Sequence, residues 1–427
     1  MAFSGLKLHP TLVQSVKTLG FVTPTPVQSQ AIPKALEGWD LLACAATGSG
    51  KTAAFLLPIL HQLIDRPRGT TRALVLAPTR ELALQIRDDF VGLARNTGLR
   101  GAAVHGGVGM GPQEKAFRTG VDVLVATPGR LLDHFSRDYA RLDGLEYLVL
   151  DEADRMLDMG FLPDIRRVLR HVPTPKQTLF FSATMPPPIE KLTREILRNP
   201  AKIKLQRRAA PAQGVAQWVY PVPSGLRGTL LVELLKNGDM DDALVFTRTK
   251  HRADRVCKLL NRKGISAERI HGNRSQAQRT RALADFKSGK CRVLVATDIA
   301  ARGIDVEALG HVVNFDIPAV PDDYIHRVGR TARADATGDA ITLVSPEDEG
   351  DLKRIERALG SKLPRVRLDG FAYEAVPEEP LEVSRSHRMA AILAQKAVGR
   401  SRAAAKEGAA ARSSRPRSRR FGAGRRS

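Results

Sequence analysis

The chain has 427 residues, which exceeds a single small domain, and it carries 67 Lys and Arg against 45 Asp and Glu. This excess of 22 positive charges, with a pI near 10.4, indicates a polyanionic partner, most simply a nucleic acid. The three cysteines are far apart and exclude a disulfide scaffold or a cysteine metal site. The N-terminus does not resemble a signal peptide and no apolar run is long enough for a membrane span, so we expect a cytoplasmic protein.

Apolar runs that favour strands alternate with helical patterns along the chain, which is typical of parallel α/β domains. Continuous apolar strands of this kind fit sheets that helices cover on both faces. The strands expected in the first half are Leu41–Ala45, Ala73–Ala77, Val121–Ala126, Tyr147–Leu150 and Thr178–Phe181. Those expected in the second half are Ala243–Phe246, Arg292–Ala296, His311–Phe315 and Ala340–Val344.

The two halves of the sequence repeat one another. The pentapeptide VLVAT at Val123–Thr127 returns at Val293–Thr297, and LVLAPTR returns as LVFTRTK at the same offset of 170 residues. His105-Gly106 returns as His271-Gly272 at an offset of 166. We therefore predict two copies of one fold at residues 1–205 and 215–368, joined by a linker at 206–214. A basic, disordered tail at 369–427 is expected to bind phosphate backbones without sequence preference.

The first half contains the sequence AATGSGKT at Ala45–Thr52, between an apolar run and the expected helix start at Ala53–Leu57. Its glycines let backbone N–H groups approach a phosphate chain, and Lys51 can reach the β- and γ-phosphates. The hydroxyl of Thr52 can ligate Mg²⁺, and the following helix directs its positive end at the phosphates. A Gly-Lys-Thr tripeptide also occurs in ordinary loops, but the strand–loop–helix order favours a nucleotide site.

Asp151-Glu152-Ala153-Asp154 follows directly after the expected strand Tyr147–Leu150. An aspartate at this place can hold Mg²⁺, and the adjacent glutamate can orient or deprotonate a water. The alternative is a strand end rich in acids that cap the next helix. The phosphate loop upstream favours the metal and water roles.

This DEAD sequence, with Ser182-Ala183-Thr184 downstream and AATGSGKT upstream, resembles the DEAD-box ATP-dependent RNA helicases over about residues 3 to 345. The compact core and basic tail are most similar to the bacterial RhlE-type branch. The resemblance implies two tandem RecA-like parallel-sheet domains that face a cleft, with ATP and Mg²⁺ as cofactors and RNA as partner. It implies that Mg²⁺ is held by Thr52 and Asp151, that Lys51 and Glu152 are catalytic, and that the phosphates contact Ala46, Thr47, Gly48, Ser49, Gly50, Lys51 and Thr52.

Phe21–Gln28 is similar to the adenine-reading element of this family. The Gln28 amide offers one donor and one acceptor, which match adenine N7 and N6, and Phe21 is placed to stack on the base. Phe3 resembles the upstream aromatic of the same element. The alternative is a capping box from Thr25 to Gln28, and both readings can hold together.

Polar groups that suit phosphodiester oxygens follow several expected strands. Taken singly, each is also typical of a turn or a helix start. As a set they match the RNA contacts of the family, which in the first half are Pro78, Arg80, Gly107, Thr127 and Arg130. In the second half they are Thr247, Arg248, Gly272, Gln276 and Thr297. None of them suits base edges, so RNA binding is expected to be largely independent of sequence.

Three arginines at 327, 330 and 333 share one helix face, which is either solvated or functional. The resemblance makes Arg330 and Arg333 arginine fingers for the γ-phosphate, and it makes Asp305 a ligand of the ribose. The residues that it assigns to coupling between the ATP and RNA sites are Ser182, Thr184, Asp154 and His326. Two departures concern only this coupling: Ala46 replaces the usual Gln, and the run at 332–335 is poorer in glycine and arginine than usual.

The sequence thus predicts an RNA-dependent ATPase that unwinds short duplexes by bending one strand or remodels RNA–protein complexes. A DNA translocase is the first alternative, and the Phe21–Gln28 element and DEAD speak against it. An ATP-gated RNA clamp or annealing chaperone is the second, and the presence of Glu152, Arg330 and Arg333 speaks against a dead enzyme. Proteins of ribosome assembly or RNA decay are the further partners that this interpretation suggests.

Overall fold

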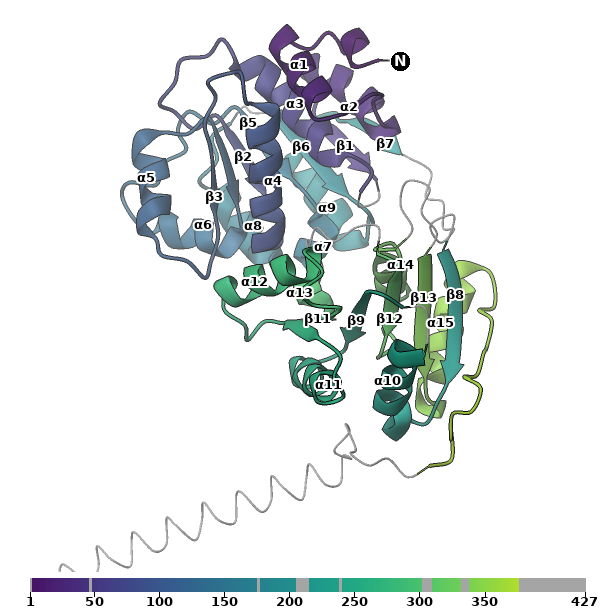
Figure 1. Cartoon of the computed structure of the whole chain (residues 1–427). Coiled ribbons are helices and arrows are strands. Elements are labelled where there is room, and N and C mark those ends of the chain that lie inside the picture. The colour runs from purple at the N-terminus through teal and green to yellow at the C-terminus, as the bar shows by residue number, and fades with distance from the viewer. Residues whose placement is uncertain are drawn as a thin grey trace, which may run out of the picture.

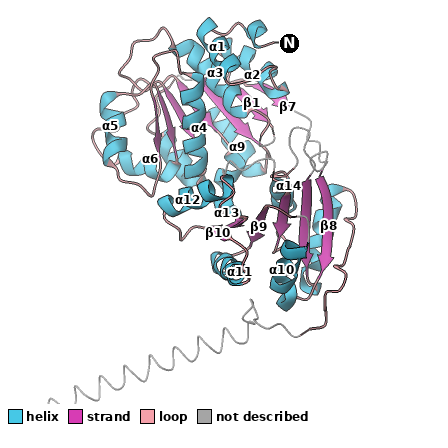
Figure 2. Ribbon diagram, in the orientation of Figure 1, coloured by secondary structure: helices cyan, strands magenta, loops and turns pink. Residues whose placement is uncertain are grey.

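The structure of the protein, a computed structural model, describes residues 2–45, 48–174, 177–204, 215–237, 240–301, 309–331 and 338–375. Within them, each half of the chain forms its own parallel sheet with helices on both faces (Figures 1 and 2). Several predicted features lie outside the described residues: Ala46, Thr47, Asp305, Arg333, the linker at 206–214 and positions 376–427 of the tail.

The first half is built around seven parallel strands in the order β3-β4-β2-β5-β6-β1-β7. These strands are β1 (Leu41–Cys44), β2 (Ala73–Leu76), β3 (Gly101–Val104), β4 (Val123–Ala126), β5 (Tyr147–Leu150), β6 (Gln177–Ser182) and β7 (Ala201–Lys204). The helices are η1 (Phe3–Leu6), α1 (Pro10–Thr18), α2 (Pro26–Leu36), α3 (Lys51–Leu63), α4 (Arg80–Leu93), α5 (Gly111–Thr119), α6 (Pro128–Phe135), α7 (Ala153–Asp158), α8 (Leu162–Leu169) and α9 (Pro187–Ile196).

Strands β2 and β4 at the centre of this sheet are buried along their whole length, as their unbroken apolar sequences ALVL and VLVA require. Successive side chains point to opposite faces. Val75 therefore packs with α1 to α4 on one face, whereas Leu74 and Leu76 pack with α5 to α9 on the other. Two apolar layers fix the sheet, and its carboxyl edge is left for the polar residues that follow each strand.

The second half has six parallel strands in the order β10-β11-β9-β12-β13-β8. They are β8 (Val215–Pro221), β9 (Ala243–Thr247), β10 (Ala267–Ile270), β11 (Val293–Thr297), β12 (His311–Asn314) and β13 (Gly338–Val344). The helices are η2 (Ser224–Leu226), α10 (Arg227–Asn237), α11 (Lys250–Arg262), α12 (Gln276–Lys287), α13 (Asp298–Ala301), α14 (Pro321–Val328), η3 (Pro346–Asp348) and α15 (Glu349–Leu359). Helices α10 and α11 cover one face, and α12 to α15 cover the other.

The predicted duplication is present strand for strand. Ala73 pairs with Val123 in the first sheet, and Ala243 pairs with Val293 in the second, so the offset of 170 residues is also an offset in register. The next strand out, β3 or β10, keeps the offset of 166. The fold class of two parallel-sheet α/β domains is therefore confirmed.

The two domains contact each other through α4 and α12, which lie next to one another in Figure 1. Glu81 on α4 accepts a hydrogen bond from Gln276 Nε2 (3.0 Å) and pairs with Arg279 (3.0 Å). This contact brings the carboxyl edges of the two sheets toward a shared cleft.

Candidate nucleotide site and RNA-binding track

The phosphate loop depends on glycine and on a contact with α2. Gly48 and Gly50 have φ of 75° and 89°, a region that other residues avoid. A Cβ on Gly50 would also lie 2.5 Å from Gln28 Nε2, which donates a hydrogen bond to the Gly50 carbonyl (3.0 Å). The loop leads directly into α3, so the free N–H groups at the start of this helix face the place expected for phosphates.

Lys51, the first residue of α3, is buried and extends beside the strand ends. Its Nζ donates to the Ala45 carbonyl (3.3 Å) and lies 3.9 Å from Asp151 Oδ1. Ser49 and Thr52 are half-buried on either side of it. The predicted phosphate and metal residues of the described loop thus converge on Asp151.

The adenine-reading element lies at the mouth of the same cleft. Gln28 forms the capping box that the sequence offered as an alternative, because its Oε1 accepts from the Thr25 N–H (2.9 Å). Phe21 is 43% exposed and lines the cleft together with Gln28. Phe3 differs: it is buried in the core of the first domain and is absent from the cleft lining.

The acidic residues after β5 are buried at the floor of the cleft. Burial raises the pKa of Asp151 to about 6, although nearby Lys51 opposes this shift. Burial would also raise the pKa of Glu152, but Arg155, Lys51 and Arg330 together lower it below its usual value. Arg155 Nη1 lies 3.1 Å from the Glu152 carboxylate. Glu152 therefore loses its proton at a lower pH than Asp151 does.

Three of the four predicted coupling residues, Asp154, Ser182 and Thr184, form one hydrogen-bonded group. Asp154 Oδ2 accepts from both the N–H and the hydroxyl of Thr184 (2.8 and 2.9 Å). The Asp154 N–H in turn donates to Ser182 Oγ (3.2 Å), which donates to the Thr184 carbonyl (2.7 Å). The last residue of the DEAD motif, Asp154, is therefore tied to the segment after β6.

The second domain adds Arg330 and His326 to this region. Arg330 is buried and lines the same cleft of about 390 Å³ as Asp151 and Glu152. His326 lines a small adjoining cavity with Arg155 and Arg330. Burial and the charge of Arg155 lower the pKa of His326 to about 4, so the imidazole is neutral at physiological pH.

Three loops of the first domain gather the predicted RNA contacts. Pro78 precedes α4, and the guanidinium of Arg80 lies so close to Gly107 that a Cβ there would be 2.0 Å from Nη1. Arg130 Nη1 donates to the Val108 carbonyl (3.0 Å), and the Thr127 N–H donates to Val104 (2.9 Å). Residues from the ends of β2, β3 and β4 thus form one surface.

The second domain places its predicted RNA contacts in the equivalent loops. Thr247 and Thr297 lie opposite each other at the ends of β9 and β11. Arg248 is half-exposed and donates through Nη2 to the Ile317 carbonyl (3.1 Å). Gly272 has open space around it. Gln276 is different, because it is buried and directed at Glu81 across the domain contact.

Comparisons with known proteins agree with this geometry. Residues 25–192 match the family model "DEAD/DEAH box helicase" and residues 227–335 match "Helicase conserved C-terminal domain". The chain is 42% identical over 364 residues to the DEAD-box ATP-dependent RNA helicase CshA of Bacillus cereus, covering 85% of this chain and 69% of that protein. It is 45% identical over 377 residues to the ATP-dependent rRNA helicase RRP3 of Kluyveromyces lactis, covering 88% and 77%. The chain belongs to the DEAD-box family of ATP-dependent RNA helicases.

A solved structure extends the agreement to the whole two-domain arrangement. S. cerevisiae Dbp5 bound to RNA and ADP BeF3 matches this helicase with a TM-score of 0.79 at 30% identity, covering 86% of this chain and 96% of that one. The predicted function as an ATP-hydrolysing RNA helicase is therefore confirmed at the level of the family. Among the described residues, no helix has the length and apolar character needed to cross a bilayer.

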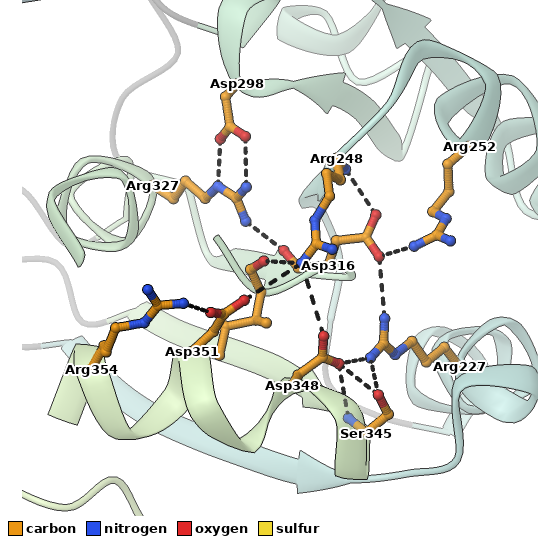
Figure 3. A network of polar contacts seen from close by, with 11 residues as sticks. Arg227, Arg248, Arg252, Asp298, Asp316, Arg327, Ser345, Asp348, Asp351 and Arg354 are labelled. Atoms are coloured by element: carbon orange, nitrogen blue, oxygen red, sulfur yellow. Dashed lines mark hydrogen bonds and ion pairs between the residues drawn. The ribbon is translucent and has the colours of Figure 1, made fainter. Parts of the chain in front are cut away.

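The helicase also contains a buried polar network that the sequence analysis missed (Figure 3). Asp316, just after β12, accepts from the Arg248 N–H (2.8 Å) and pairs with Arg227 (3.2 Å) and Arg252. Arg327 donates to the Asp316 carbonyl (2.7 Å) and to Asp298 (2.7 Å). The network fixes the Arg248 loop relative to α14, the helix that carries His326 and ends two residues before Arg330.

Asp316 obeys the rule that found the other site residues, because it follows the expected strand His311–Phe315 directly. That signal was available in the sequence. Glu81 and Arg279 had no such signal, since each acts through a partner from another element. Arg155 pairs with Glu152 three residues earlier, at the start of the same helix.

Proposed function

We propose that RNA spanning the two domains switches on ATP hydrolysis in this helicase. Closure around ATP then bends one strand, and this separates short duplexes or remodels RNA–protein complexes. The observation that carries the proposal is the divided site: Lys51 and Glu152 come from the first domain and Arg330 from the second, yet all three line one cleft. A ligand that holds the domains together is needed to complete such a site.

In this proposal the chain's own residues perform the phosphoryl chemistry. Lys51 and the N–H groups at the start of α3 hold the phosphates. Glu152 orients the attacking water and accepts its proton as the oxygen bonds to the γ-phosphorus and the bond to the β,γ-bridging oxygen breaks. Arg330 stabilises the charge on the γ-phosphoryl oxygens. Asp305 as ribose ligand and Arg333 as second finger lie outside the described residues and rest on the family resemblance.

The residues present fit Mg²⁺, which we propose is held by Thr52 and Asp151. A buried carboxylate is costly unless a cation balances it, and the ammonium group of Lys51 lies 3.9 Å from the carboxylate of Asp151. A hydroxyl and a carboxylate are the oxygen ligands that this ion prefers beside phosphates. When bound, Mg²⁺ neutralises charge on the phosphate oxygens.

RNA is proposed to lie along the loops that carry Arg80 and Arg130 in the first domain and Arg248 in the second. Guanidinium, hydroxyl and backbone N–H groups contact the phosphodiester chain and carry no base information. The Asp154–Thr184 hydrogen bonds are proposed to transmit closure from the ATP site to this track. His326, buried against the acidic motif, is the counterpart in the second domain.

The remaining assignments are finer proposals. We propose domain limits at 1–205 and 215–368 with a linker at 206–214, which the ends of β7 at Lys204 and of α15 at Leu359 support. We also propose a cytoplasmic location and a place in the RhlE-type branch, on the compact core and the basic tail. The rRNA helicase RRP3 among the relatives supports a partner in ribosome assembly.

The test is ATP turnover with and without single-stranded RNA, with DNA of the same sequence as the control. Turnover should rise with RNA and little with DNA. Equal turnover in all three conditions would contradict the proposal.

A further inference from the structure

Helix α11 presents one strongly basic face that the site described above does not use. Arg255, Lys258 and Arg262 follow His251 at intervals of four, three and four residues, so they share one face. All four are exposed. The opposite face of the helix is buried against the second sheet. We call His251, Arg255, Lys258 and Arg262 the α11 stripe.

The helix has a single acidic residue, Asp254. Asp254 is held by Arg269 Nε (2.6 Å) and by His271 Nε2 (3.2 Å), so its carboxylate is already balanced from β10 and the loop that follows it. Helix α15, on the other face of the same sheet, has acids among its bases, namely Glu349, Asp351 and Glu356. The basic bias of α11 is therefore not shared by α15.

The stripe begins where the proposed RNA track ends. α11 starts two residues after Arg248, and Lys250 Nζ donates to Asn273 Oδ1 (3.0 Å), next to Gly272. Arg252, one residue beyond His251, points inward to Asp316 and so anchors the helix to the loop that carries Arg248 (Figure 3). A rigid connection joins the two surfaces.

We propose that the α11 stripe is a second RNA-binding surface, which holds the phosphodiester backbone of RNA that leaves the cleft past Arg248. The proposal rests on the proposed RNA track. Exposed guanidinium and ammonium groups without aromatic neighbours on the helix fit phosphates and not bases. The eleven helical steps from His251 to Arg262 span about 17 Å, which corresponds to about five nucleotides of one helical strand.

The test removes the three permanent charges in the variant Arg255→Gln/Lys258→Gln/Arg262→Gln. RNA affinity should fall, and the log–log salt slope should flatten by about 2, since each contact contributes about 0.7 on a single strand. The loss of RNA affinity in the variant, relative to the unchanged protein, should therefore be about 20-fold larger at about 50 mM than at about 200 mM salt. A matched control, Lys353→Gln/Arg357→Gln/Lys362→Gln, removes the same charge from exposed positions at and after α15 and should bind as the unchanged protein does.

RNA length gives a second readout that a general loss of stability would not produce. On an RNA just long enough for the cleft, the stripe variant and the unchanged protein should bind alike. Extension by about five nucleotides should raise affinity only in the unchanged protein, and ATP turnover at saturating RNA should stay the same in both.

The proposal would be overturned if the stripe variant and the unchanged protein bound the extended RNA with the same affinity and the same salt slope. It would also be overturned if the control variant lost as much RNA affinity as the stripe variant. Either result would favour an acidic protein as the partner of the stripe. Because the stripe is judged on binding alone, its failure is distinct from a failure of RNA to stimulate ATP turnover.

Discussion

The backbone of Glu152 is in the left-handed conformation, with φ 52° and ψ 49°. Few residues other than glycine adopt this conformation. Such a conformation costs on the order of 1–3 kcal/mol and persists where the surroundings enforce it. Here the Glu152 N–H donates to Asp151 Oδ1 (2.9 Å) and Arg155 holds the side chain. The strain is consistent with a carboxylate that must be aimed at one point in the cleft.

The variant Glu152→Gln should lower ATP turnover by roughly 10²- to 10⁴-fold, because an amide cannot accept the proton of the attacking water. ATP binding should survive, so the closed complex should accumulate and retain RNA as long as ATP is present. Turnover and RNA retention are measured on one preparation, with the exposed acid of the same helix changed in Asp158→Asn as the control. Normal turnover in the Glu152 variant would remove this residue from the mechanism.

Arg155 should set the pH at which Glu152 works. Its positive charge lowers the pKa of Glu152, so Arg155→Gln should raise that pKa. A carboxylate with a higher pKa becomes protonated at a higher pH. The acid limb of the turnover–pH profile should therefore shift to higher pH. Arg155→Lys keeps the charge and should keep the profile near that of the unchanged protein. Identical acid limbs in all three proteins would show that Arg155 has only a structural role.

At the scale of elements, central strands were predictable and edge strands were not. All nine expected strands occur, each within two residues of its predicted limits, because buried parallel strands read as unbroken apolar runs. The strands that were missed are β3, β7, β8 and β10, which lie at the sheet edges. β7, β8 and β10 carry polar residues, and β3 consists mostly of small residues. Their sequences GAAV and AERI lack the apolar density that marks a central strand.

The same limit applies to the site. The predicted residues of the described part lie together where a motif places them directly after a strand, as with Asp151 and Thr247. Contacts between distant elements had no such pattern, and the pair of Glu81 and Arg279 is the clearest case. A single sequence shows which functional groups each loop carries. It does not show which side chains meet across the contact between the two domains.

The Glu81–Arg279 pair should stabilise the closed arrangement of α4 and α12, since both side chains are about nine-tenths buried. Glu81→Arg and Arg279→Glu should each lower RNA-stimulated ATP turnover, because like charges then face each other. The double exchange should recover part of the loss, with a coupling energy of about 0.5–3 kcal/mol. Arg281→Gln, at an exposed position of α12, is the control. Additive losses in the double exchange would show that the two residues do not act as a pair.

At the scale of the whole molecule, one fold is used twice and only the first copy carries a phosphate loop. The second copy retains the order of six of the seven strands and supplies Arg330 from the segment that follows α14. Duplication thus accounts for a site whose halves face each other across a cleft. It also explains why the proposed RNA contacts recur at equivalent strand ends in both domains.

The basic tail should add RNA affinity without taking part in turnover. From Leu381 to Ser427 the sequence has 13 Lys and Arg against Glu382 and Glu407, which is half of the excess charge of the chain. Deletion of Ser384–Ser427 should weaken RNA binding and flatten its salt slope by about 0.7 for each lost contact on single strands. Turnover at saturating RNA should survive, because the catalytic residues and the contacts through Arg80, Arg130 and Arg248 remain. Binding is measured over a salt series beside turnover, with the α11 stripe variant as a comparison that retains the tail. The same affinity and slope after deletion would assign the tail's charge to a partner other than RNA.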